Sequence, residues 1–196
     1  KYKNEIHANE IVLLAYYIAA INIEAVYHGL AGGDYQPFEG ICLTDTFRLS
    51  EDDLISQMLA DNSARRKRQQ KLDIRVIMGN PPYSAGQASV NDKNENVTYP
   101  SLDERISNTY AQRSTQTLKR KLYDSYIRAI RWGSDRIEGK RGVMAYVSGS
   151  AWIERQFADG MRKSLAEEFT SIYVFHLRGD IRKNILSGGK AGRSEE

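Results

Sequence analysis

The residues with the most distinctive chemistry follow an apolar run and are Gly79, Asn80, Pro81, Pro82 and Tyr83. The Asn80 side chain offers an acceptor oxygen, and the proline after it holds this residue in an extended conformation. The two prolines remove two backbone N–H donors and fix φ twice, so the carbonyl groups point in fixed directions. Tyr83 adds a flat aromatic face. Together these groups provide two acceptors for an –NH2 group and a platform for a planar ring.

Positive charge is concentrated in one short segment. The net charge of the chain is only +3, yet residues 65–75 hold six cations against one acid. Such a cluster suits the phosphate backbone of a nucleic acid. It also suits a solvated helix end, where cations complement the helix dipole. The cations that we predict to contact DNA in this segment are Arg65, Arg66, Lys67 and Arg68.

Length and composition indicate a globular domain. The chain has 196 residues, of which 41% are hydrophobic, enough to form a core. Its longest apolar run, residues 11–21, is about half of the roughly 20 residues that a membrane span needs, so we expect a buried helix and no membrane partner. The single cysteine, Cys42, excludes an internal disulfide and indicates a reducing, cytoplasmic location. The lack of paired cysteines or clustered histidines argues against a structural zinc site.

Helices and strands must alternate to position these residues. Helices are predicted at residues 10–24, from Ser50 to the basic cluster, at 118–137 and at 151–168. Apolar strands are predicted at residues 41–43, 74–78, 143–149 and 171–177. The segment of about 84–116 holds few apolar residues and reads as a long polar loop. Residues from about 178 to 196 read as a polar tail.

Continuous apolar strands separated by helices are typical of a parallel sheet with helices on both faces. In such sheets, ligands bind outside the carboxyl ends of the strands. Asp45 closely follows the strand predicted at 41–43, and Asn80 closely follows the strand predicted at 74–78. We therefore expect an α/β fold with a mainly parallel sheet and a functional site along this edge.

The stretch from Gly79 to Tyr83 resembles the catalytic motif of amino-methyltransferases that use S-adenosylmethionine, above all the N6-adenine DNA methyltransferases. This resemblance implies a Rossmann-like methyltransferase fold and an adenine flipped out of double-stranded DNA. It implies that the Asn80 side chain and the Pro81 carbonyl accept hydrogen bonds from the adenine N6 amine. Pro82 belongs to the same catalytic motif, and Tyr83 would stack on the base. Positioning then carries the catalysis, because N6 attacks the methyl group in line.

Two further segments resemble cofactor motifs of this family. Glu10 matches the acid that binds the ribose hydroxyls of S-adenosylmethionine, and an ordinary acid at a helix start is the alternative. In the stretch CLTDTF, Asp45 matches a residue near the cofactor adenine amine, and Phe47 one against its ring. A turn or capping role is the alternative for Asp45. Asn80 is also expected to contact the cofactor.

The stretch VFHLRGDIRK resembles an LRGN-R signature of large single-chain restriction–modification enzymes that join a helicase to an adenine methyltransferase. The resemblance implies that Arg178 and Arg182 approach DNA, although Asp180 stands where the signature has asparagine. It also implies that the remainder of a parent polypeptide supplies helicase, nuclease and target-recognition parts.

The F-x-G-x-G cofactor turn of the family has no counterpart in this sequence, because the Gly-rich residues 29–34 follow a helix and 186–192 lie near the far end. We therefore expect residues 1–196 to be an N-terminally truncated methyltransferase domain that is inactive, or nearly so, alone. Methyltransferases acting on a protein glutamine or an RNA base amine carry the same motif and are one alternative. A non-catalytic DNA-binding module is another.

Overall fold

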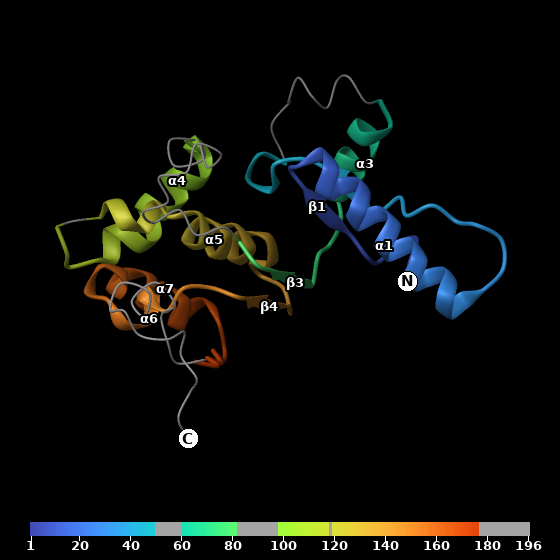
Figure 1. The fold of residues 1–196 in the computed structure, drawn as a ribbon. Coiled ribbons are helices and arrows are strands. Elements are labelled where there is room, and N and C mark those ends of the chain that lie inside the picture. The colour runs from blue at the N-terminus through green and yellow to red at the C-terminus, as the bar shows by residue number, and fades with distance from the viewer. Residues whose placement is uncertain (50–59, 82–97, 118, 177–196) are drawn as a thin grey trace, which may run out of the picture.

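The computed structural model describes residues 1–49, 60–81, 98–117 and 119–176. These residues form a mixed α/β structure with two pairs of short parallel strands (Figure 1). Strand β1 (Ala8–Glu10) pairs with β2 (Ile41–Leu43), and β3 (Val76–Gly79) pairs with β4 (Val143–Tyr146). The predicted α/β class and the parallel pairing are confirmed. The strands of the described residues nevertheless form two separate sheets, where one continuous sheet was expected.

Helix α1 (Leu13–Ala31) links the first pair of strands. Parallel neighbours need a crossover connection, because the chain must return to the starting edge of the sheet. The helix ends at Gly32, whose φ of +62° is a conformation that glycine adopts without steric cost. Tyr2, Phe38 and Ile41 form a small core against one side of α1.

The prediction of a mostly buried helix here is right about the helix and wrong about the burial. None of the residues of α1 is buried within the described chain. Large apolar side chains on it are exposed, Leu14 by 69%, Ile21 by 61% and Leu30 by 86%. Strands β1 and β2 pack against one side of α1 and leave much of the helix exposed.

By length and composition, α1 is the one helix among the described residues that is apolar enough to cross a membrane. This helix lies near the N-terminus, and none of the residues in its apolar window is buried. The core helix of a soluble protein meets the same two criteria.

Two helical segments follow β2. The 3-10 helix η1 (Thr46–Arg48) begins at Asp45, whose side chain caps it. Helix α3 (Ala60–Gln70) carries most of the basic cluster. The start predicted for this helix at Ser50 lies outside the described residues.

Much of the segment predicted as a polar loop is helical. Helix α4 (Pro100–Ile106) begins with proline, which is favourable at the first helical position. It continues as a π-helical turn, η3 (Ser107–Ala111). Leu102, Ile106 and Tyr110 recur every fourth residue and are all buried, so they form one apolar stripe. Because most residues between them are polar, the overall composition of the segment indicates a loop and does not reveal this stripe.

The connection to β4 continues through the 3-10 helix η4 (Arg120–Tyr123) and helix α5 (Ser125–Ile137). The single helix predicted at 151–168 is three short helices: α6 (Ala151–Glu154), the 3-10 helix η5 (Gln156–Ala158) and α7 (Asp159–Glu168). The extended backbone of Arg155, with φ −91° and ψ 146°, ends α6. Residues 171–176 are not the predicted strand and are exposed, and the predicted tail lies outside the described residues.

The larger core surrounds α5. In Figure 1, helices α4 to α7 gather in one part of the molecule, apart from α1, β1 and α3. The buried members of this core are Ile106, Tyr110, Ala111, Leu122, Tyr126, Ile127, Ile130, Ala158, Met161 and Leu165. Helix α7 lies so close to η3 that a Cβ atom at Gly160 would overlap the backbone oxygen of Tyr110.

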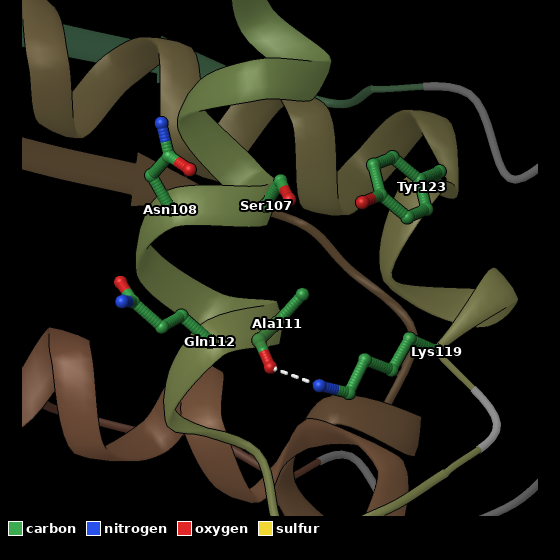
Figure 2. A pocket seen from close by; sticks show the side chains of 6 residues that line it. All are labelled: Ser107, Asn108, Ala111, Gln112, Lys119 and Tyr123. Carbon is green, nitrogen blue, oxygen red and sulfur yellow. Dashed lines mark hydrogen bonds between the residues drawn. The ribbon is translucent and has the colours of Figure 1, made fainter.

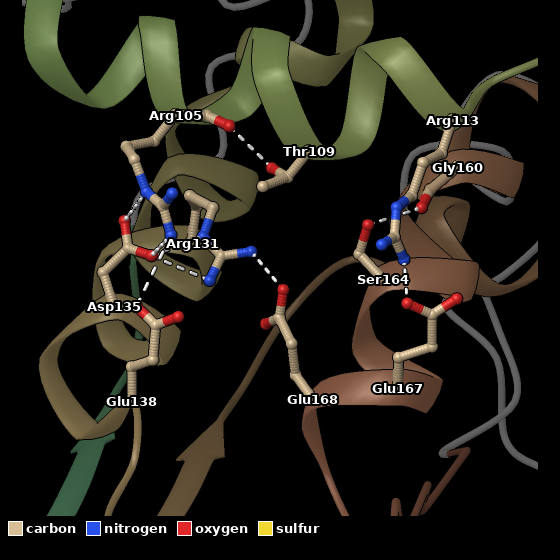
Figure 3. A network of polar contacts seen from close by, with 10 residues as sticks. All are labelled: Arg105, Thr109, Arg113, Arg131, Asp135, Glu138, Gly160, Ser164, Glu167 and Glu168. Carbon is tan, nitrogen blue, oxygen red and sulfur yellow. Dashed lines mark hydrogen bonds and ion pairs between the residues drawn. The ribbon is translucent and has the colours of Figure 1, made fainter.

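A polar network crosses this core (Figure 3). The Arg131 side chain is 1% exposed and donates to Asp135 at 3.0 Å and to Glu168 at 2.7 Å. Arg105 donates to the same Asp135 carboxylate from α4 at 2.7 Å. Burial alone would lower the pKa of Arg131. The hydrogen bond to Glu168 and the nearby acids raise this pKa by more than burial lowers it, so the group stays charged. The network therefore ties α4, α5 and α7 together.

The Asp159 carboxylate holds the segment after η3 to the start of α7. Its oxygens accept hydrogen bonds from the Ser114 hydroxyl at 2.5 Å, the Thr115 backbone N–H at 2.9 Å and the Gly160 N–H at 2.7 Å. These donors, Ser114 first, hold the pKa of Asp159 well below its usual range. A carboxyl group whose pKa is lower folded than unfolded stabilises the fold above its unfolded pKa of about 3.9 and loses this contribution as pH falls.

We predict that Asp159→Asn lowers the free energy of local opening around residues 114–115 by about 1–3 kcal/mol at pH 7, because an amide NH2 replaces one acceptor. Amide hydrogen exchange of peptides from this segment measures the change. The difference from the unaltered protein should shrink below about pH 4, where the carboxyl group of the opened state becomes protonated while that of the folded state is still charged. Asp34→Asn, in an exposed loop, is the control and should change nothing. An equal difference at pH 7 and pH 3 would contradict the ionic role.

Candidate functional site

Two of the predicted cofactor residues lie at the same edge of the first sheet. Glu10 is the last residue of β1 and is in register with Leu43, the last residue of β2. The backbone N–H of Thr44 donates to the Glu10 carbonyl at 2.8 Å. Asp45 follows directly, so the structure brings Glu10 and Asp45 together beyond the carboxyl ends of parallel strands.

The Glu10 side chain caps the turn that leads into α1. Its Oε1 atom accepts hydrogen bonds from the backbone N–H groups of Ile11 at 2.8 Å and Val12 at 3.0 Å. The other carboxylate oxygen, Oε2, accepts no hydrogen bond from the described residues, which leaves it available to a hydroxyl group. Glu10 thus acts as an acid at a helix start through Oε1, and its Oε2 is still able to bind a ligand.

Asp45 is the N-cap of η1 and is also held from a distant segment. Its Oδ1 accepts a hydrogen bond from the Phe47 backbone N–H at 3.0 Å, and its Oδ2 accepts one from the Tyr99 hydroxyl at 2.9 Å. The Phe47 ring meets the Tyr99 ring edge to face, with centroids 5.1 Å apart. The structure therefore groups Asp45 and Phe47 around a third residue, and their contact with a cofactor stays a prediction.

Sequence reasoning missed Tyr99. It directly precedes the proline that opens α4, and such an aromatic residue in a polar segment is the one signal that marks it. Its side chain is buried, and the guanidinium groups of Arg48 and Arg128 lie over its ring. Burial, followed by the hydrogen bond to Asp45, raises the pKa of the Tyr99 hydroxyl, so this group remains a donor at neutral pH.

The predicted catalytic segment begins at the carboxyl end of β3. Gly79 is in register with Tyr146 of β4, and its carbonyl accepts a hydrogen bond from the Val147 N–H at 3.1 Å. A Cβ atom at Gly79 would lie 3.0 Å from the Tyr146 ring, so glycine allows this close approach without displacing the ring. Burial raises the pKa of Tyr146 to about 12.

Asn80 is exposed directly after β3, and Pro81 is buried. The buried proline thus anchors the backbone directly beside an exposed asparagine. Pro82 and Tyr83 lie outside the described residues, so their predicted roles remain predictions.

The basic cluster contains buried, partly buried and exposed side chains, and some of them, exposed Arg68 included, already donate hydrogen bonds. Arg66 is only 4% exposed and donates to the Arg48 carbonyl at 3.1 Å, so we correct its prediction as a phosphate contact. Arg65 donates to the Tyr16 hydroxyl at 3.1 Å, and Arg68 to the Glu39 carbonyl at 2.9 Å. A cation on a helix can pack across neighbouring elements, which charge counting along the sequence does not reveal.

Lys67 and Arg68 are exposed on α3 and remain candidates for phosphate contact. Arg178 and Arg182 lie outside the described residues. Their predicted approach to DNA stays a prediction.

A separate hollow of about 350 Å³ opens between η3 and the segment that contains η4 (Figure 2). The residues that line it are Ser107, Asn108, Ala111, Gln112, Lys119 and Tyr123. Lys119 donates to the Ala111 carbonyl at 2.6 Å across this hollow. The hollow includes none of the predicted site residues.

Neither a scan of known protein families nor a search of curated proteins finds a match to this chain. Solved structures do match. A nuclease-deletion mutant of the Type ISP restriction-modification enzyme LlaGI, in complex with a DNA substrate mimic, is 48% identical with a TM-score of 0.83 over 93% of this chain. The ATP-dependent Type ISP restriction-modification enzyme LlaBIII, bound to DNA, is 50% identical with a TM-score of 0.77 over 84%.

A DrdV–DNA complex is 44% identical to this chain over 86% of its length, with a TM-score of 0.78. The chain covers only 15% of the LlaGI structure, 11% of LlaBIII and 16% of DrdV. It is therefore similar, in sequence and in fold, to one segment of much larger proteins, two of which are Type ISP restriction–modification enzymes.

Proposed function

We propose that this chain is part of the methyltransferase region of a longer restriction–modification polypeptide. In this proposal the reaction moves a methyl group from S-adenosylmethionine to the N6 amine of an adenine flipped out of double-stranded DNA. The observation that carries the proposal is the exposed Asn80 between Gly79 and a buried Pro81, at the carboxyl end of a parallel strand. The likeness to segments of Type ISP enzymes supports it.

The proposed work of the catalytic segment is to hold the amine. The Asn80 side-chain oxygen and the Pro81 carbonyl each accept a hydrogen bond from the N6 amine. These two hydrogen bonds orient the nitrogen lone pair toward the methyl group. Gly79 lets β3 pack directly on Tyr146, so the acceptors are fixed by a paired strand. Fixed acceptors stabilise the charge that develops at N6 without reorganising during the reaction.

The strand ends of the first sheet fit the proposed cofactor. S-adenosylmethionine supplies the methyl group, a ribose diol and an adenine ring. The available Oε2 of Glu10 suits a ribose hydroxyl, and the oxygens of Asp45 suit the adenine amine. The Phe47 ring offers an apolar face at the same edge.

The exposed side of α1 indicates how the chain is placed in the parent polypeptide. A large apolar surface needs a cover, and we propose that another part of the same polypeptide provides it. A bilayer suits this helix poorly, because the Glu24 carboxylate near its middle is held by the Phe38 N–H at 2.8 Å and the Tyr35 hydroxyl at 2.9 Å. The exposed Lys67 and Arg68 would face DNA.

The decisive experiment incubates the intact parent protein with labelled S-adenosylmethionine and three substrates: duplex DNA, an RNA and a peptide-release factor. We expect label in DNA only and N6-methyladenine in its digest by mass spectrometry. Label in the release factor or the RNA would replace the proposal with methylation of a different amine. DNA binding without any cofactor binding would identify a non-catalytic module.

A further inference from the structure

The Asp45 carboxylate is oriented by two donors that lie far apart in the sequence. The Phe47 backbone N–H donates to Oδ1 at 3.0 Å, and the Tyr99 hydroxyl donates to Oδ2 at 2.9 Å. A carboxylate has about four acceptor positions, so each oxygen keeps a further lone pair. The direction of these remaining lone pairs is set by the two donors already bound.

The Tyr99 ring is itself held on several sides. It is 6% exposed, with the guanidinium carbons of Arg48 and Arg128 at 5.4 and 5.1 Å from its centroid. The Phe47 ring stands edge-on to it at 5.1 Å. Cations over an aromatic face and an edge-to-face ring restrict both its position and its tilt. The hydroxyl therefore reaches Asp45 from a fixed direction.

The backbone of Tyr99 is anchored as firmly as its ring. Its N–H donates to the Asp103 carboxylate at 3.1 Å, and its carbonyl accepts from the Asp103 N–H at 2.7 Å. Arg128 of α5 pairs with both oxygens of that carboxylate, at 2.7 and 2.8 Å. Tyr99 thus links the end of β2 to α4 and α5.

We propose that Tyr99 is a positioning residue that aims the Asp45 carboxylate at the exocyclic amine of a purine nucleoside cofactor. This inference rests on the proposed function, because it concerns the same cofactor edge. The Tyr99 hydroxyl uses one lone pair of Oδ2 and leaves the others directed outward. The same ring fixes Phe47, which would lie against the purine. Tyr99 contacts Asp45 and Phe47, and neither the methyl group nor the target base.

The alternative is that Tyr99 is a structural brace, which only holds β2, α4 and α5 together and does not orient Asp45. A brace needs the ring, its two cations and the Asp103 hydrogen bonds, all of which survive removal of the hydroxyl. Aiming needs the hydroxyl itself, and it matters only for a ligand that carries the amine. The test therefore removes the hydroxyl from the protein and the amine from the cofactor, separately and together.

The experiment measures cofactor binding by calorimetry in the full-length protein that contains this chain. The variant is Tyr99→Phe, and the ligands are S-adenosylmethionine and its analogue with hydrogen in place of the adenine amine. We expect Tyr99→Phe to raise the Kd for S-adenosylmethionine about fivefold, in line with the loss of one hydrogen bond. We expect no change in Kd for the analogue, and an unchanged kcat at saturating cofactor. Tyr35→Phe is the matched control, since its hydroxyl also donates to a carboxylate, that of Glu24, at 2.9 Å.

Each outcome of this experiment is decisive. Weaker binding of S-adenosylmethionine alone supports the aiming role. An unchanged Kd for both ligands is the result that a structural brace predicts, and it overturns the inference. An equal loss for both ligands overturns it too, because the hydroxyl would then not act through the adenine amine. The proposed function survives these two results, because the unaltered protein still binds cofactor and methylates DNA. Failure of the unaltered protein to bind S-adenosylmethionine overturns both.

Discussion

Asn80→Ala in the intact parent protein should reduce the rate of methyl transfer to DNA by about a hundredfold or more, the usual cost of losing one fixed group that stabilises transition-state charge. Asn80 is exposed at the end of β3, on a backbone held by Tyr146 and by the buried Pro81. Removing its carboxamide therefore deletes one acceptor for the amine and leaves the strand in place. Single-turnover methylation at saturating cofactor measures this step.

Cofactor binding is the second measurement for the same variant. The Kd for S-adenosylmethionine should stay close to that of the unaltered protein, because Glu10 and Asp45 lie at the other pair of strands. Asn108→Ala is the matched control, an exposed asparagine on η3 that should leave both quantities unchanged. Loss of cofactor binding in Asn80→Ala, with a normal rate once cofactor is bound, would contradict the catalytic role.

The sequence was informative wherever a short apolar run ended in residues of restricted conformation. The strand before Asn80 and the strand before Asp45 were both predictable, because prolines and capping residues mark where a strand must stop. The parallel arrangement followed from the helices between them. These features are local, and periodicity over a few residues is enough to detect them.

The missed features depend on contacts between distant segments. Tyr99 reaches Asp45 across 54 positions of sequence, and no local pattern records such a partner. Arg66 looked like part of a phosphate-binding cluster until its guanidinium was found against the carbonyl of Arg48. For α1 the difference runs the other way, because an expected contact is not found. Its apolar composition predicts burial, but no described residue covers its exposed side.

Burial also distinguishes two arginines in and around the larger core. Arg131 donates to two carboxylates while it is 1% exposed (Figure 3). Its guanidinium carbon also lies over the Tyr110 ring, 5.2 Å from the centroid. Arg113 also pairs with a carboxylate, that of Glu167, but its side chain is 43% exposed. Water can replace the partner of an exposed charge. The carboxylates that pair with Arg131 are less accessible to water, because Asp135 is 26% and Glu168 31% exposed, so water replaces their partner less well.

Arg131→Met should therefore lower the free energy of local opening of α5 and α7 by about 2–3 kcal/mol, below the full cost of breaking a buried pair, because Asp135 and Glu168 are partly exposed. Methionine fills most of the volume of the arginine stem, so the loss reports the carboxylates left without Arg131 more than a cavity. Glu168 is the main one, because Asp135 keeps its ion pair with Arg105. Amide hydrogen exchange of peptides from both helices in the intact protein measures it.

Arg113→Met is the matched control for this variant, and it should cost no more than about 1 kcal/mol because exposed ion pairs contribute little. Adding Glu168→Gln to Arg131→Met should recover part of the loss, since it removes one of the stranded charges. Equal costs for Arg131→Met and Arg113→Met would show that burial does not decide the value of these pairs. Recovery by Glu168→Gln would show that the network stabilises α7 through charge compensation.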